Sequence, residues 1–174
     1  MSANKRRTTT RASTKGSRTK AASPQYRKLA LRRLLVPLDF SGKSRQALDF
    51  AVPLAQQYGG KVILVHVVEL MPSYPPYPAE MMIAAPTPRP DTKASREALS
   101  NFARELVPRE LLARAIVRTG RAYREILDVA IEEDVDLIVI ATHGYTGLKH
   151  VLLGSTTEHV VRYAHCPVLT VRRD

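Results

Sequence analysis

The sequence contains little of what secreted and membrane-spanning proteins depend on. It has one cysteine, Cys166, which excludes an intrachain disulfide and a cysteine-based zinc cluster and fits a reducing compartment. No stretch approaches the run of about eighteen apolar residues that a membrane-spanning helix needs. The N-terminus also lacks the apolar segment of a secretory signal. We therefore expect a soluble, cytoplasmic protein.

Acidic residues are absent from the first 33 residues, which hold eleven of the 27 lysines and arginines. The rest of the chain has 16 basic and 16 acidic residues, so the net charge of +11 resides in this leader. Large apolar side chains are scarce up to about Lys28, and such a segment cannot offset its own ordering entropy. We assign residues 1–30 to a disordered basic tail and residues 31–174 to one folded domain.

Two further interpretations of the tail stay open. Its richness in arginine, serine and threonine is typical of an organelle transit peptide, although nothing apolar gives it an amphipathic face. Its positive charge would also suit weak electrostatic contacts with nucleic acid.

Beyond the tail, compact apolar runs alternate with longer segments of helical period, as is typical of βα units around a parallel sheet. The pattern predicts a three-layer α/β/α sandwich with a five-stranded, parallel, open sheet of the Rossmann-like kind. The expected strands cover residues 34–38, 62–68, 112–117, 136–140 and 168–171, and the expected helices cover 43–58, 93–106, 123–131 and 155–164. On the third helix we expect one buried stripe of Tyr123, Ile126, Leu127, Ala130 and Ile131.

A glycine-rich loop after the fourth strand carries the strongest functional signal. Residues 142–156 contain three glycines and end on Ser155 and Thr156 at the start of a helix. Glycine permits close approach of a phosphate, and a helix N-terminus supplies free amides and the positive end of the helix dipole. The loop also leaves the carboxyl end of a central strand, where open α/β sheets bind ligands. These features favour a phosphate site, but a turn in which Ser155 or Thr156 merely caps the helix has the same composition.

The same segment resembles the ATP-binding branch of the universal stress protein family. That family's pattern is glycine, two residues, glycine, nine residues, glycine, then serine or threonine, and this chain has Ala141, Gly144, Gly154 and Ser155 at the fixed positions. The similarity extends from the first strand to the last. It implies an adenine nucleotide alpha hydrolase-like fold with ATP as the ligand. The methyl group of Ala141 would lie near the ribose, so we expect a modest effect on affinity.

Asp39 ends the first strand, and we interpret it as a ribose ligand because a carboxylate beside a triphosphate would repel it. The resemblance implies the same role and adds that the backbone around Val67 pairs with the adenine edge. A simple turn residue is the competing interpretation of Asp39. The expected nucleotide-binding residues are Pro37, Leu38, Asp39, Val67, Ile140, Ala141, His143, Gly144, Gly154, Ser155 and Thr156.

Catalysis finds little support in the sequence. Residues 42–44 look like the end of a Walker A loop, but Pro37 stands where that motif requires glycine, so we expect this segment to cap the first helix. Residues 145–157 contain no acidic residue to position water, so ATP hydrolysis should be slow and we name no catalytic residue. The histidines have no metal-site spacing. Mg²⁺ would neutralise the triphosphate through bound water, without a protein ligand that can be named.

The sequence therefore favours an ATP-binding regulatory module, in which nucleotide occupancy changes the partner surface of a dimer in stress response, as the resemblance implies. The alternatives are a slow ATPase or nucleotide-transfer enzyme, and a nucleic-acid-associated protein acting through the basic tail. We expect a homodimer because the strand at residues 168–171 should lie at the sheet edge with unpaired backbone groups.

Overall fold

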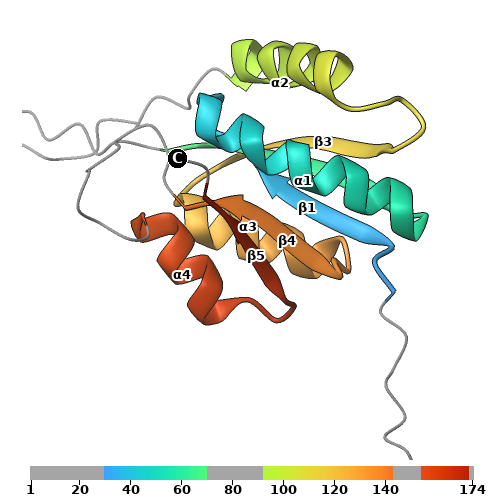
Figure 1. Ribbon diagram of the computed structural model, residues 1–174. Coiled ribbons are helices and arrows are strands. Elements are labelled where there is room, and N and C mark those ends of the chain that lie inside the picture. The colour runs from blue at the N-terminus through green and yellow to red at the C-terminus, as the bar shows by residue number, and fades with distance from the viewer. Residues whose placement is uncertain (1–29, 70–91, 143–153, 173–174) are drawn as a thin grey trace, which may run out of the picture.

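A computed structural model describes residues 30–69, 92–142 and 154–172 (Figure 1). These residues alternate strictly between strand and helix, as the sequence pattern predicts. In chain order the elements are β1 Arg33–Pro37, α1 Gly42–Tyr58, β2 Lys61–Val68, α2 Thr92–Leu106, β3 Leu112–Thr119, α3 Ala122–Glu132, β4 Leu137–Ala141, α4 Ser155–Tyr163 and β5 Val168–Val171. The predicted fold class is confirmed.

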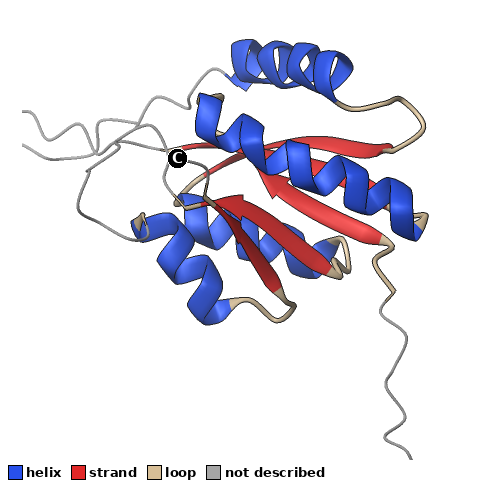
Figure 2. Ribbon diagram, viewed as in Figure 1, coloured by secondary structure: helices blue, strands red, loops and turns tan. Residues whose placement is uncertain are grey.

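The strands form one parallel sheet in the order β3-β2-β1-β4-β5. Helices α1 and α2 cover one face of this sheet, and α3 and α4 cover the other (Figure 2). Because the chain builds outward from β1 in one direction and then returns to add β4 and β5 on the other side, the winding reverses between β1 and β4. Open sheets of this kind bind ligands at the carboxyl ends of the strands beside such a reversal.

The central strand β1 contributes to both cores of the molecule. Leu34 and Val36 pack with residues of α1 and α2, whereas Leu35 packs with residues of α3 and α4. All three side chains are fully buried, because successive residues of a strand face opposite sides of a sheet that is covered twice. This double burial explains why the strands read as continuous apolar runs.

The ends of α1 follow the expected capping chemistry. Ser41 is the N-cap residue, and its hydroxyl oxygen accepts a hydrogen bond from the Ser44 amide at 3.2 Å. The helix ends at Gly59, which adopts the left-handed conformation with a φ of 68°. Residues 42–44, expected to cap this helix, form its first turn instead, and the cap is the residue before them, Ser41. Among the described residues, no helix is long and apolar enough to cross a membrane.

The buried stripe of α3 differs from the prediction at one position. Ile126 and Ala130 are buried as expected, but Ile131 is 64% exposed and Val129 is buried in its place. At about 100° per residue, Ile131 points about 140° away from Ile126, whereas Val129 lies only about 60° from it. The expected stripe was therefore too wide on one side.

These two isoleucines offer a matched test of the α3 packing. We expect Ile126→Ala to lower the free energy of unfolding by about 2 to 5 kcal/mol, since it removes a buried side chain and leaves a cavity. Ile131→Ala should change it by less than about 0.5 kcal/mol, because that side chain is exposed. Urea unfolding of both variants measures the difference, and equal losses would contradict the packing of α3.

Candidate functional site

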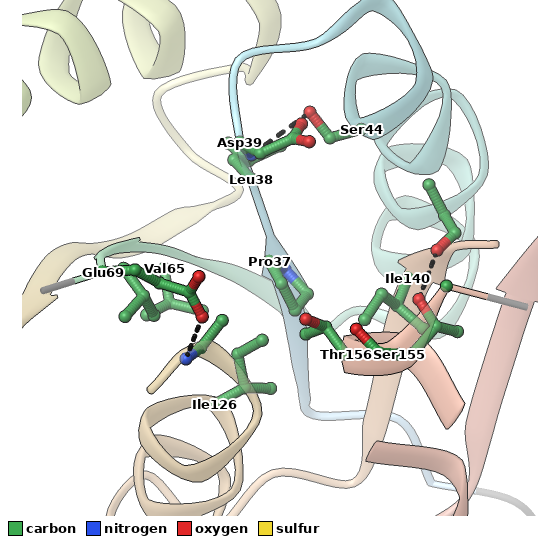
Figure 3. Close-up of a pocket in the computed structure, with 15 residues that line it drawn as sticks. Pro37, Leu38, Asp39, Ser44, Val65, Glu69, Ile126, Ile140, Ser155 and Thr156 are labelled. Atoms are coloured by element: carbon green, nitrogen blue, oxygen red, sulfur yellow. Dashed lines mark hydrogen bonds between the residues drawn. The ribbon is translucent and has the colours of Figure 1, made fainter. Parts of the chain in front are cut away.

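A pocket of about 310 Å³ lies at the carboxyl ends of β1, β2 and β4 (Figure 3). Its floor is formed by these strand ends and its walls by the first turns of α1, α3 and α4. Parallel strands end at the same edge of the sheet, so residues that are far apart in the chain meet there. The lining residues are Pro37, Leu38, Asp39, Ser44, Val65, Val67, Glu69, Ala122, Ile126, Ile140, Ala141, Gly154, Ser155, Thr156 and Thr157.

Nine of the eleven residues expected at the nucleotide site line this one pocket. The other two, His143 and Gly144, lie outside the described residues. The nine are Pro37, Leu38, Asp39, Val67, Ile140, Ala141, Gly154, Ser155 and Thr156. The other lining residues were not predicted from the sequence, because they have no place in the glycine-loop pattern; they are Ser44, Val65, Glu69, Ala122, Ile126 and Thr157.

The first turn of α4 faces the pocket with two hydroxyl groups (Figure 3). Gly154 is the N-cap residue, and among the described residues no side chain forms a capping hydrogen bond there. The alternative in which Ser155 or Thr156 caps this helix is therefore wrong, since both lie inside its first turn. The first amides of a helix have no acceptor within the helix and mark its positive end. This wall of the pocket suits an anion.

Thr157 fixes the start of α4 above the end of β4. Its side chain is buried, and its hydroxyl donates a hydrogen bond to the Ala141 carbonyl at 2.8 Å. The Gly154 amide donates in turn to the Thr142 carbonyl at 2.7 Å. These two bonds leave Ser155 and Thr156 in a defined position at the pocket. The third residue of the Ser-Thr-Thr run was the available signal for Thr157 in the sequence.

The backbone of β2 opens toward the pocket at Val67. The Leu38 amide donates to the Val65 carbonyl at 2.8 Å, and the Gly120 amide donates to the Val68 carbonyl at 3.1 Å. Because alternate residues of a strand direct their backbone groups to opposite neighbours, Val67 directs its amide and carbonyl to the same side as Val65. The β1 ladder ends opposite Val65. The donor and acceptor of Val67 therefore face the space that β1 vacates.

Asp39 is both a turn residue and a pocket residue. Its carboxylate accepts hydrogen bonds from the Ser41 amide at 3.0 Å and from the Ser41 hydroxyl at 2.6 Å, which is the local pattern of an Asx turn. The same side chain lines the pocket between β1 and α1 (Figure 3). The turn and the ligand interpretations of Asp39 are thus compatible.

Phe40 and His66 pack together beside this turn. Phe40 adopts a φ of 61°, which is unusual for a residue with a bulky side chain. Its ring lies 4.3 Å from the His66 ring and 5.8 Å from that of Phe102, between centroids. The His66 Nδ1 atom hydrogen-bonds the Leu38 carbonyl at 2.8 Å. His66 has the structural role expected from its place in a strand.

Glu69 closes the pocket on the side of β2. Its carboxylate accepts a hydrogen bond from the Ala122 amide at 2.9 Å, at the start of α3 (Figure 3). A carboxylate is stabilised at a helix N-terminus by the free amides and the helix dipole. The signal in the sequence was an acidic residue directly after the apolar run of a central strand.

Two side chains outside the pocket have shifted pKa values. Arg124 donates a hydrogen bond to the Tyr123 hydroxyl at 3.1 Å and lowers the pKa of Tyr123. The Tyr123 ring also stacks on His159 with 4.5 Å between centroids, which connects α3 to α4. Burial raises the pKa of the Cys166 thiol. Cys166 lies just before β5, near the amino ends of the strands, whereas the pocket lies at their carboxyl ends. Neither shift concerns the pocket directly.

The described residues offer no metal centre. No group of three histidine, cysteine or acidic side chains within them is placed to hold an ion. Asp39 and Glu69 each bond to a neighbouring group of the protein. Within the described part of the pocket, the side chains therefore do not form a set of three ligands for a Mg²⁺ ion.

Residues 30–172 match the sequence model of the Universal stress protein family. The chain belongs to this family. It is 30% identical over 147 residues to universal stress protein MJ0531 of Methanocaldococcus jannaschii, with 82% of each chain covered. It is 33% identical over 146 residues to universal stress protein YxiE of Bacillus subtilis, with 80% of this chain and 98% of the relative covered.

Solved structures agree with this fold. Protein MJ0577, a universal stress protein of M. jannaschii, matches with a TM-score of 0.65 and 26% identity over 83% of this chain and 97% of its own. A universal stress protein in complex with cAMP matches with a TM-score of 0.55 and 22% identity, over 82% of this chain and 98% of its own. The Archaeoglobus fulgidus universal stress protein in complex with dAMP matches with a TM-score of 0.57 and 20% identity, over 83% of this chain and 100% of its own. The last two support the fold alone.

Two hydroxyl residues of α4 should differ in their effect on stability. We expect Thr157→Val to lower the free energy of unfolding by about 1 to 3 kcal/mol, because it removes the buried hydrogen bond to Ala141 without changing the shape of the side chain. Ser155→Ala should change it by less than about 0.5 kcal/mol, since Ser155 is exposed in the first turn. Thermal unfolding without nucleotide compares them. The reverse order would contradict the placement of α4.

Proposed function

We propose that this universal stress protein is a cytoplasmic, ATP-binding regulatory module of the stress response. The observation that carries the proposal is the order of groups along the carboxyl edge of the sheet. The open backbone of Val67 lies one residue before the end of β2, Asp39 follows β1, and the first turn of α4 covers β4. Since β1 lies between β2 and β4, the three groups occur in the order in which a nucleotide presents base, ribose and phosphate.

The phosphate end is the first turn of α4. Free amides, the helix dipole and the hydroxyls of Ser155 and Thr156 together stabilise negative charge. The base end is Val67, whose amide and carbonyl match the adjacent acceptor and donor on the edge of adenine. β2 and β4 lie two strand spacings apart, roughly 10 Å, which suits the two ends of one nucleotide. Two other universal stress proteins have been solved in complex with cAMP and dAMP, and we extend an adenine nucleotide to this chain as part of the proposal.

Gly154→Val should abolish ATP binding while the protein stays folded. The backbone at Gly154 has φ −65° and ψ 152°, a conformation that valine adopts without strain. The added side chain would occupy the approach to the first amides of α4. Calorimetric titration with ATP, alongside thermal unfolding, tests this. A folded Gly154→Val variant with unchanged ATP affinity would overturn the proposed function.

Two other variants separate the phosphate end from the ribose end. Ser155→Ala should weaken ATP by about tenfold, the effect of one hydrogen bond to a charged group worth about 1.5 kcal/mol. Asp39→Ala should weaken the binding of ATP and of AMP to the same extent. Gly154→Val should weaken the binding of ATP more than that of AMP. Asp39→Asn is the matched control for the turn, because its amide oxygen still accepts the hydrogen bond from the Ser41 amide. Loss of ATP but not AMP in Asp39→Ala would contradict the ribose assignment.

A homodimer through β5 is part of this proposal. β5 lies at the edge of the sheet, next to β4. The carbonyls of Pro167 and Val171 accept hydrogen bonds from the β4 side, so Thr170 directs its backbone groups outward. An exposed edge of this kind is available for pairing with a second copy. ATP binding at α4, which contacts β5, would then alter the surface of the dimer.

Thr170→Pro should convert the dimer to a monomer. Proline removes the outward amide, and an edge strand tolerates proline where the amide is not used within the sheet. Thr170→Ala is the control, because it keeps the amide and should remain dimeric. Light scattering at micromolar concentration measures both. A monomeric unchanged protein, or a dimeric Thr170→Pro variant, would contradict pairing through β5.

A further inference from the structure

The base end of the pocket carries a charged acceptor that the nucleotide contacts described above do not use. Glu69 directly follows β2, two positions after Val67, and both residues line the pocket. Residues two positions apart on a strand point to the same face. The Glu69 carboxylate therefore lies on the side of Val67 that faces α3, where Figure 3 shows it bonded to the Ala122 amide.

The bond to Ala122 holds the carboxylate in place before any ligand arrives. One oxygen of Glu69 accepts from the amide at 2.9 Å, and the start of α3 provides a positive end for the charge. A fixed side chain does not lose its rotamer freedom again when a ligand binds. The second oxygen of the carboxylate remains an acceptor and cannot act as a donor.

Glu69 itself is exposed, but the pocket wall near the end of β2 is lined by apolar side chains. Val65, Val67 and Ile126 line this wall, and their apolar side chains offer a surface for the flat face of a ring. Consider a base whose ring lies over these side chains and whose edge meets the Val67 backbone. The exocyclic substituent at that edge then points toward Glu69. An amino group there donates to the carboxylate, whereas a carbonyl oxygen sets two acceptors against each other.

We propose that Glu69 makes this pocket select a base with an exocyclic amino group over one with a carbonyl at the same position. Adenine has the amino group and hypoxanthine has the carbonyl, on otherwise matching rings. Glu69 acts as a specificity determinant that touches the base, in addition to its structural bond to α3. The inference rests on the proposed nucleotide site and goes beyond it, because the Val67 backbone alone does not require a charged acceptor.

Titration of the full chain with ATP and with ITP measures this selectivity. The unchanged protein should bind ATP at least tenfold more tightly than ITP. Glu69→Gln should reduce that ratio by about tenfold, since the amide oxygen can still accept from Ala122 while its NH₂ group donates to the carbonyl of hypoxanthine. The same ratio in Glu69→Gln and in the unchanged protein would overturn the inference, even if ATP binds well.

Glu105→Gln is the matched control. Glu105 is exposed on α2 and pairs with Arg45 of α1, on the other face of the sheet. It loses the same charge as Glu69→Gln, so the ratio of ATP to ITP affinity should remain that of the unchanged protein. An equal fall in the ratio for both variants would indicate a general charge effect and would overturn the inference.

A change of ligand tests recognition of the amino group, by Val67 and Glu69 together, should Glu69→Gln fail to show a cooperative thermal transition. Purine riboside triphosphate lacks the amino group and should bind the unchanged protein at least tenfold more weakly than ATP. Equal affinities would overturn the inference and the pairing of the Val67 carbonyl with the amino group, while leaving the nucleotide site itself in place. A chain that binds none of the three nucleotides would overturn the proposed function and this inference together.

Discussion

The pairing of β1 with both β2 and β4 is the constraint on which the rest of the structure depends. β1 is only five residues long, and its side chains fill the cores on both faces of the sheet. Its ladder with β2 ends opposite Val65. Beyond that point the chain turns away at Asp39, so the end of β2 pairs with β3 but has no partner on the β1 side. The early end of this central strand opens the pocket.

The walls of the pocket are fixed by hydrogen bonds between elements and not by the strand ends alone. Thr157 connects α4 to β4, and Glu69 connects α3 to β2. Asp39 and Ser41 together shape the turn into α1. Three helices thus present their N-termini around one space, each held by a different polar side chain. Such an arrangement leaves the first turn of α4 available for an anion, while the first turn of α3 is occupied by a carboxylate of the protein itself.

Much of the fold could be predicted because burial on both faces leaves a local record in the sequence. The strand expected at residues 168–171 has the observed bounds, and the start of α1 was recognisable at residues 42–44, although the cap itself is Ser41. Ile131 was wrongly expected to be buried because the sequence does not fix how wide the buried face of a helix is. Only the packing of α3 on the sheet decides which side of that face is covered. In the pocket, the glycine-loop residues were accessible from spacing, whereas Ile126 and Ala122 belong to a helix with no such pattern.

The sequence by itself determined the alternation of strands and helices, the position of the glycine-rich loop before α4 and the neutral charge of the chain beyond its basic leader. These properties depend on local periodicity and composition, which are present in the sequence itself. Only the tertiary structure decided that Val67 has an open backbone edge, that Gly154 and not Ser155 caps α4, and that Glu69 bonds to α3. Each of these depends on where one strand ends relative to its neighbour, and that register arises from packing between segments far apart in the chain.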